Sequence, residues 1–310
     1  MNLQQLIEQY ITFRKSLGEL QRSNGATLRA FGRAIGTNTD IADVRAKQVD
    51  AFLAGTGPRT LTWHLKLNVL RPFYRYAVSR GYVTTAPLPT EIPKRPPAFV
   101  PYIYSHEDLR RLLKASLSVR PPQASLEPVT MRTLLLLLYG TGLRIQEALD
   151  LNSTDVDLKN SLLTVRQTKF GKTRLVPFGP ALSRPLTDYA ARHLSAASAP
   201  FFTMRSGIRV KRETMEHNHR LLCTRAGVCR TDGARYQPRL HDLRHTFAVH
   251  RLTAWYREGA DVQKLLPLLS VYLGHVHLQH TQVYLTMTPE LLHEAGKRFE
   301  HYAGKEQHHD

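Results

Sequence analysis

Hydrophobic residues recur at helical spacing through the first part of the chain. Positions three or four residues apart lie on one face of an α-helix, so a stripe of this kind indicates an amphipathic helix with one buried side. In the first stretch the stripe consists of Leu3, Leu6, Ile7, Tyr10 and Ile11. The pattern predicts helices over residues 2–16, 26–35, 46–54 and 58–81. The last of these begins after Thr56-Gly57 with Pro58 at the first helical position, where proline is favoured.

A proline-rich segment interrupts this pattern between residues 86 and 101. It contains six prolines, together with Lys94 and Arg95. Chains of this composition are stiff and extended, which is typical of a linker. We therefore expect a helical domain over residues 1–85, a basic linker over residues 86–101 and a second domain over residues 102–310.

The second domain is predicted to begin with helices. Ser105 followed by Glu107 and Asp108 is a typical helix start, because a serine side chain can cap the first turn and acidic residues favour its positive end. The run from Leu134 to Tyr139 is too apolar for a surface helix and indicates a core helix, which is expected to break at Gly140–Gly142 and to start again at Leu143.

One β structure is expected within this helical domain. Residues 161–167 and 173–178 have the composition of strands, and Phe170-Gly171 between them is a turn signal, so the pattern predicts a β-hairpin. From Leu186 to His301 the helical pattern returns. The predicted fold class is therefore mainly α, with a small β-hairpin or sheet in the C-terminal domain.

Composition and charge narrow the functional classes. The 43 lysine and arginine residues against 25 acidic residues give a net charge of +18, which favours a polyanionic partner such as nucleic acid or an acidic membrane surface. The two cysteines, Cys223 and Cys229, are too few for a disulfide framework and lack the spacing of a structural zinc site. No signal-peptide pattern is present and the longest apolar run is too short to span a bilayer, so we expect a cytoplasmic protein without a membrane partner.

Residues suited to phosphate chemistry gather in four separated segments. These are Thr141-Gly-Leu-Arg144-Ile-Gln-Glu147, the predicted hairpin with Lys169, His241-Asp-Leu-Arg244-His245, and Leu273-Gly-His275 followed nine residues later by Tyr284. With these motifs, in this order and spacing over most of residues 101–290, the chain resembles the tyrosine recombinases of the phage-integrase and Xer-type family.

The resemblance implies a site-specific recombinase that cuts and rejoins double-stranded DNA through a covalent 3′-phosphotyrosyl intermediate, for the integration, excision or resolution of a mobile element or chromosome. It also implies a two-domain DNA clamp, in which an N-terminal SAM-like helical core-binding domain closes on the duplex opposite the catalytic domain. A homo-tetramer on two DNA sites is expected, or an assembly with a related recombinase, in the cytosol or nucleoid of a bacterium. No cofactor or metal is expected.

The chemistry of these residue types agrees with that resemblance. Arg144 and Arg244 are the expected clamp on the two non-bridging phosphate oxygens, because a guanidinium forms paired, charge-assisted bonds to phosphate. Tyr284 is the expected nucleophile and His241 the base that takes its proton, since a neutral phenol attacks poorly.

Three further residues are assigned supporting roles. Lys169 is expected to donate a proton to the leaving 5′ oxygen, with Lys172 as the neighbouring competitor. His275 is expected to hydrogen-bond a non-bridging oxygen, because Gly274 can end a helix and turn the backbone. Glu147, one helical turn after Arg144, is expected to orient that arginine.

Several alternatives stay open at this point. His241 and His245 share a helix face, as in zinc enzymes, but Asp242 replaces the glutamate base of such motifs and no third ligand has the expected spacing, so His245 is expected to pack within the fold. A type IB topoisomerase would use the same residue types as a monomer, and a catalytically inactive protein would bind DNA without an adduct. The predicted helix over residues 289–302 could dock on a neighbouring protomer or pack within its own.

Overall fold

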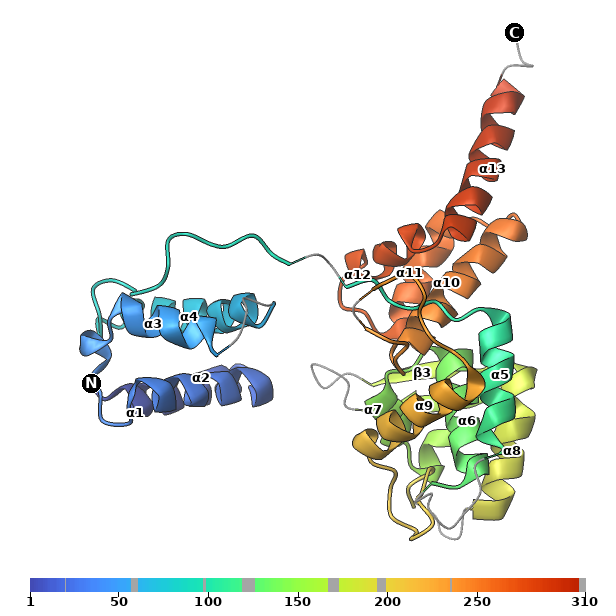
Figure 1. Ribbon diagram of the computed structural model, residues 1–310, viewed down its shortest axis with the longest axis horizontal. Coiled ribbons are helices and arrows are strands. Elements are labelled where there is room, and N and C mark those ends of the chain that lie inside the picture. Colours follow the sequence, from blue (N-terminus) through green and yellow to red (C-terminus); the bar gives the residue numbers. More distant parts are fainter. Residues whose placement is uncertain are drawn as a thin grey trace. The chain divides into compact units, whose positions relative to one another are not determined.

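The computed structural model describes residues 1–19, 21–56, 61–96, 99–118, 126–166, 173–193, 199–234 and 236–306. The chain divides into two compact units, Met1–Phe99 and Val100–Asp310 (Figure 1). Each unit has its own hydrophobic core. Among the described residues, no helix has both the length and the apolar character needed to cross a membrane.

The Met1–Phe99 unit is helical. Its elements are α1 (Leu3–Ser16), α2 (Arg22–Ile35), the 3-10 turn η1 (Ile41–Asp43), α3 (Ala46–Ala54) and α4 (Leu61–Ser79). The periodic stripe of α1 is buried as predicted, and it packs against α2 and α4. The four predicted helices are therefore confirmed, although α2 begins four residues earlier than expected, and the predicted start of α4 at Pro58 lies outside the described residues.

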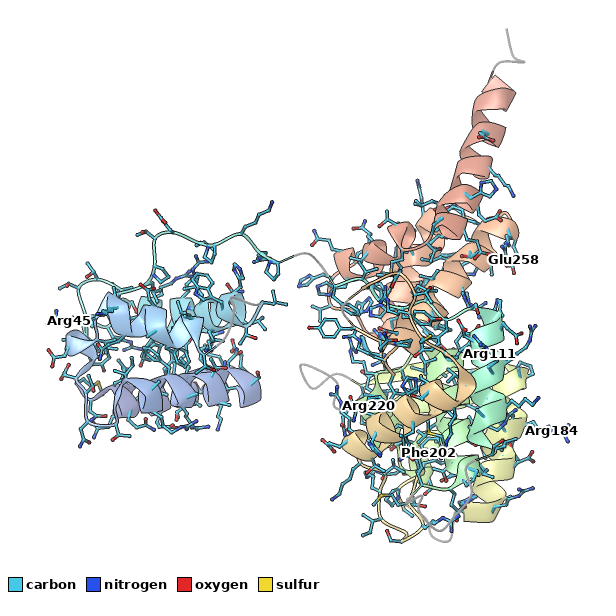
Figure 2. The ribbon with its side chains drawn as sticks, viewed as in Figure 1. Arg45, Arg111, Arg184, Phe202, Arg220 and Glu258 are labelled. Carbon is cyan, nitrogen blue, oxygen red and sulfur yellow. The ribbon has the colours of Figure 1, made fainter. Side chains whose placement is uncertain are left out.

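The Val100–Asp310 unit is mainly helical, and its helix α6 is strongly apolar. Its helices are α5 (His106–Ser116), α6 (Pro128–Thr141), α7 (Ile145–Leu149), α8 (Pro180–His193), α9 (Arg212–Ala226), α10 (Asp242–Arg257), α11 (Val262–Leu273), α12 (Gln279–Gln282) and α13 (Pro289–Glu306). The apolar run predicted as a core helix forms α6, which packs against α5, α8 and α10. Figure 2 shows the contrast between buried apolar and exposed charged side chains in this unit. Phe202 lies inside it, whereas Arg184 on α8 points into solvent.

A small sheet lies between α7 and α8 in the chain. The strands β1 (Val156–Asp157), β2 (Leu162–Val165) and β3 (Arg174–Pro177) form an antiparallel sheet in the order β1-β2-β3, and the 3-10 turns are η2 (Ser153–Asp155) and η3 (Val283–Thr286). The predicted hairpin is confirmed by the pairing of β2 with β3, while its turn lies outside the described residues. The sequence did not reveal β1, which is only two residues long and pairs Val156 with Leu163.

The ends of the helices determine where the candidate site residues lie. The Ser105 cap is confirmed, since its Oγ accepts a hydrogen bond of 3.0 Å from the Asp108 backbone N–H. Helix α6 continues through Gly140 and ends at Thr141, because Gly142 adopts a left-handed conformation with φ +61°. The chain becomes helical again at Ile145 rather than at Leu143, so Arg144 stands directly before α7.

Helix α13 begins by packing within its own unit. Leu291 is fully buried against α10, and Arg257 of α10 forms ion pairs with Glu290 and Glu294. The next residue, Leu292, is half exposed, and Figure 1 shows the C-terminal turns of α13 extending beyond the other helices of the unit. The start of the helix thus packs within its own protomer.

Candidate active site

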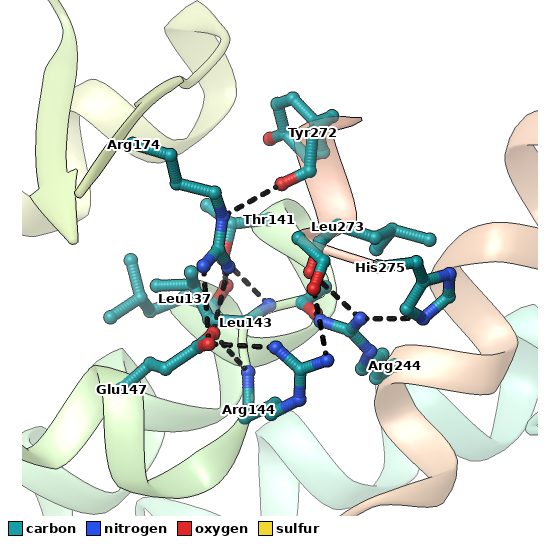
Figure 3. Close-up of polar contacts among 12 residues, drawn as sticks. Leu137, Thr141, Leu143, Arg144, Glu147, Arg174, Arg244, Tyr272, Leu273 and His275 are labelled. Atoms are coloured by element: carbon teal, nitrogen blue, oxygen red, sulfur yellow. Dashed lines mark hydrogen bonds and ion pairs between the residues drawn. The ribbon is translucent and has the colours of Figure 1, made fainter. Parts of the chain in front are cut away.

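Four of the predicted site residues meet where the ends of several helices converge. Arg144 stands at the start of α7, Arg244 in the first turn of α10, His275 just after α11 and Tyr284 in η3. Polar contacts connect the arginines to the residues around them (Figure 3). Residues 140 positions apart in the sequence thus share one site.

Arg244 is the most enclosed member of this group. Only 2% of its surface is exposed, and its guanidinium donates to the carbonyl oxygens of Gly142 and Leu273, each at 2.8 Å. The same group lies 2.8 Å from His275 Nε2. Burial, and then the positive charge of Arg144, lower the pKa of Arg244 to about 10, so it remains charged at neutral pH.

The contacts of His275 define its protonation. An arginine N–H can only donate, so His275 Nε2 accepts from Arg244, and Nδ1 carries the proton and donates to Thr281 Oγ1 at 2.7 Å. Burial and the charges of Arg244 and Arg144 lower the pKa of His275 to about 3. The expected hydrogen bond to a phosphate oxygen would require Nε2 to be a donor, and thus a rearrangement at this nitrogen.

Glu147 holds Arg144 at two points. One carboxylate oxygen accepts from the Arg144 backbone N–H at 3.0 Å and the other from Arg144 Nη1 at 2.8 Å. The second terminal nitrogen of Arg144 donates to the Gly274 carbonyl oxygen at 3.2 Å. Since 37% of the Arg144 side chain is exposed, it is fixed in place while part of it can still be reached from solvent.

Arg174 on β3 is a member of this network that the sequence did not reveal. Its two terminal nitrogens donate to the two Glu147 oxygens at 3.1 and 2.7 Å, and its Nε donates to the Tyr272 carbonyl oxygen at 3.0 Å. Burial raises the pKa of Glu147, but Arg174 and Arg144 outweigh it and hold that pKa at about 2. Nothing in the spacing distinguished Arg174 from a solvent-exposed strand residue.

Tyr284 is almost completely buried among site residues. Only 3% of it is exposed, and its ring centre lies 6.0 Å from that of His275 and 5.6 Å from that of His245. Burial raises the pKa of the phenol, while the charge of Arg244 opposes that effect. By contrast Tyr272 stacks on Phe247, with ring centres 5.7 Å apart.

The ring of His245 lies between contacts with His241 and with the tyrosine. The ring centres of the two histidines are 5.0 Å apart, and His245, which was expected only to pack, contacts Tyr284. Although solvent reaches His241, the protein around it and the nearby positive charges lower its pKa to about 3, and burial lowers that of His245 to about 4. His245 Nδ1 is buried without a hydrogen-bond partner among the described residues. Both rings are therefore neutral at pH 7.

Lys169 and its competitor Lys172 lie outside the described residues. The strands on either side of them, β2 and β3, belong to the sheet from which Arg174 reaches the site. Within the described ranges, no group of three or more histidine, cysteine, aspartate or glutamate side chains could hold a metal ion.

Residues 103–290 match the family model described as the phage integrase family. The protein y4rB of Sinorhizobium fredii, named as an integrase/recombinase, is 37% identical over 304 residues, which are 96% of each chain. The chain belongs to the phage integrase family of tyrosine recombinases. Tyrosine recombinase XerC of Chlorobaculum tepidum is 31% identical over 83% of this chain and 77% of its own.

A solved structure shares the fold of this tyrosine recombinase. The lambda integrase tetramer bound to a Holliday junction superposes with a TM-score of 0.66, at 15% identity, over 92% of this chain and 77% of that one. The mainly helical fold with a small antiparallel sheet is thereby confirmed. As a member of this family the protein is a site-specific DNA recombinase that cleaves and rejoins DNA strands, and the topoisomerase and binding-only alternatives are not favoured.

Proposed function

We propose that this recombinase cleaves double-stranded DNA by attack of Tyr284 on a backbone phosphodiester. The phenolic oxygen forms a bond to phosphorus, the bond to the 5′ oxygen breaks, and a 3′-phosphotyrosyl bond and a free 5′ hydroxyl result. The observation that carries this proposal is the contact of the buried Tyr284 ring with His275, beside Arg244.

The two arginines are suited to hold the phosphate during this step. Charge builds on the non-bridging oxygens in the transition state, and donors that are already fixed stabilise it without reorganisation. Arg244 is held by two carbonyl oxygens, and Arg144 is held by Glu147 while part of it stays exposed. In this proposal Arg144 meets the phosphate first, and Arg244 binds it from within the site.

Proton transfer is assigned to groups on either side of the phosphate. His241 takes the phenolic proton, and its lowered pKa keeps the ring neutral before this step. His245 is a second candidate for this base, because its ring contacts Tyr284 and its Nδ1 has no hydrogen-bond partner among the described residues. Lys169 donates the proton to the leaving 5′ oxygen.

Rejoining completes the recombination. The free 5′ hydroxyl attacks the phosphotyrosine of a partner strand, so the phosphate bond passes between strands and no external energy source is required. We propose a tetramer on two DNA sites, in which residues 1–85 form the core-binding domain, residues 86–101 the linker and residues 102–310 the catalytic domain, clamped on the duplex. The lambda integrase tetramer on a Holliday junction supports this assembly.

Trapping the covalent intermediate tests this function. Labelled DNA from the flanks of the protein's own gene carries a nick beside the cleavage position, so that the short 5′-hydroxyl fragment diffuses away and rejoining stops. We expect a slow, protease-sensitive band on a denaturing gel with the wild-type protein and none with Tyr284→Phe. The matched control is Tyr256→Phe, a tyrosine against the same hydrophobic cluster. A band that persists in Tyr284→Phe, or no band on DNA that the protein binds, would contradict the proposal.

A further inference from the structure

Arg174 connects three segments whose relative positions matter for the proposed chemistry. It lies on β3, and it binds both oxygens of Glu147, the carboxylate that also holds Arg144. It also binds the carbonyl of Tyr272 at the end of α11, close before His275 (Figure 3). Its side chain is only 12% exposed. A paired arginine–carboxylate contact has fixed geometry, so this one restrains both partners.

The backbone at Gly274 is shaped around this arginine. Gly274 adopts φ +71°, and a Cβ at this position would lie 2.8 Å from Arg174 Nη1 and 2.9 Å from Cζ. On its other side, the Gly274 carbonyl accepts from Arg144. The residue directly before His275 thus contacts both arginines, and only a glycine leaves the space that Arg174 fills.

Charge gives Arg174 a second effect on Arg144. Glu147 contacts two arginines, so its single negative charge does not cancel that of Arg144 alone. If Arg174 were removed, Glu147 would have Arg144 as its remaining partner and would compete more strongly with a phosphate for that guanidinium. Arg174 therefore leaves Arg144 with charge to offer to DNA.

We propose that Arg174 is a positioning residue, which acts through Glu147 on Arg144 and through the Tyr272 carbonyl on the turn that carries His275. It does not itself need to touch the DNA. This inference rests on the proposed function, because it concerns the arrangement of residues assigned to phosphodiester cleavage.

The test measures the rate of adduct formation on the nicked DNA together with DNA affinity. Arg174→Ala is expected to lower the single-turnover rate by about 10- to 100-fold, the size of effect that a misplaced reacting group produces, with affinity within about twofold of wild type. Arg174→Lys is expected to recover part of the rate, because lysine keeps the charge but cannot span two carboxylate oxygens and a carbonyl. The lysine variant also serves if the alanine variant does not fold.

A double-mutant comparison separates positioning from general loss of structure. When Arg174→Ala is added to a Glu147→Gln protein, the single-turnover rate is expected to fall by less than about threefold further. The reason is that the effects of two residues that act through one another are not additive. The matched control is Arg166→Ala, which removes an arginine from the buried carboxylate of Asp155 beside the same sheet and is expected to cleave at the wild-type rate.

Three results would overturn the inference while the wild-type adduct still forms. These are full activity in Arg174→Ala, the same fold loss of rate in both backgrounds, or an equal loss in Arg166→Ala. Absence of the adduct in the wild-type protein, or its persistence in Tyr284→Phe, would instead overturn the proposed function and this inference with it.

Discussion

Arg244 illustrates how individual side chains are held in this site. A buried arginine requires acceptors for its N–H groups. Gly142 and His275 provide them from two connections between helices, and Leu273 provides one from the end of α11. Two of these three acceptors are carbonyl oxygens and the third is an imidazole nitrogen, so none of them is a carboxylate. Such an arginine keeps its positive charge available for an incoming phosphate.

Buried neutral histidines give a prediction for stability at acidic pH. His219 is 1% exposed, its Nε2 lies 3.1 Å from the Tyr104 hydroxyl, and burial lowers its pKa to about 4. Its pKa in the unfolded chain is about 6.5, so between these values the unfolded state binds more protons than the folded state. The free energy of unfolding should therefore fall as the pH drops from 6.5 towards 4.

The size of this effect can be measured with one variant. For His219 alone, the loss between pH 7 and pH 5 is about 2 kcal/mol, as a shift of this size implies. Urea unfolding at pH 7 and pH 5 measures the decrease in the free energy of unfolding. This decrease should be about 2 kcal/mol smaller for His219→Gln than for the wild type. His217→Gln, on the exposed side of the same helix, is the control and should behave like the wild type. An unchanged loss in His219→Gln would contradict the prediction.

At the scale of elements, the connection between α6 and α7 is tightly constrained at Gly142. Gly142 combines φ +61° with close packing, since a Cβ there would lie 2.5 Å from Phe247 Cδ1 and 2.9 Å from Leu273 Cδ2. Its carbonyl also accepts from Arg244. This turn ends the core helix, leads into Arg144 and holds Arg244 through the Gly142 carbonyl.

Gly142→Ala should therefore destabilise the protein in two ways. A left-handed conformation costs a non-glycine residue about 1–2 kcal/mol, and overpacking adds about 1–3 kcal/mol, so the free energy of unfolding should fall by about 2–5 kcal/mol. Gly259→Ala is the matched control, because Gly259 has φ +71° after α10 but open space around it. In urea unfolding, the free energy of unfolding of Gly259→Ala should fall only by the conformational cost of about 1–2 kcal/mol. Equal losses in the two variants would show that the packing around Gly142 adapts.

At the scale of the whole molecule, the positive charge and the two-unit organisation together predict how DNA binding depends on salt. A net charge of +18 is spread over a chain whose two units each have a separate core. If both units contact DNA, as proposed, many phosphates are neutralised and their counterions are released. Binding should then depend strongly on salt.

This salt dependence is measurable without cleavage. For Tyr284→Phe, the DNA affinity should fall by about 10³- to 10⁵-fold between about 50 and 200 mM salt, as expected for roughly six to ten phosphate contacts. The linear dependence of the logarithm of affinity on that of salt concentration, measured by fluorescence anisotropy, gives the number of contacts. A fall of less than about tenfold would contradict a DNA clamp formed by both units.

The sequence by itself determined most helices and most of the predicted site. Helical periodicity depends on neighbours three or four residues apart, so α1, α3 and α6 were found from local patterns. The motif residues Arg144, Glu147, Arg244, His275 and Tyr284 were found because their types and spacing resemble those of a known family.

The tertiary structure alone decided which other side chains join them. Arg174 contacts a carboxylate 27 positions away and a carbonyl 98 positions away, and His245 contacts the Tyr284 ring. Such contacts depend on how β3, α7 and α11 pack, and no local period or spacing encodes that packing. The reason is physical: periodicity records which side of an element is buried, whereas an ion pair requires two particular side chains to meet after the core has formed.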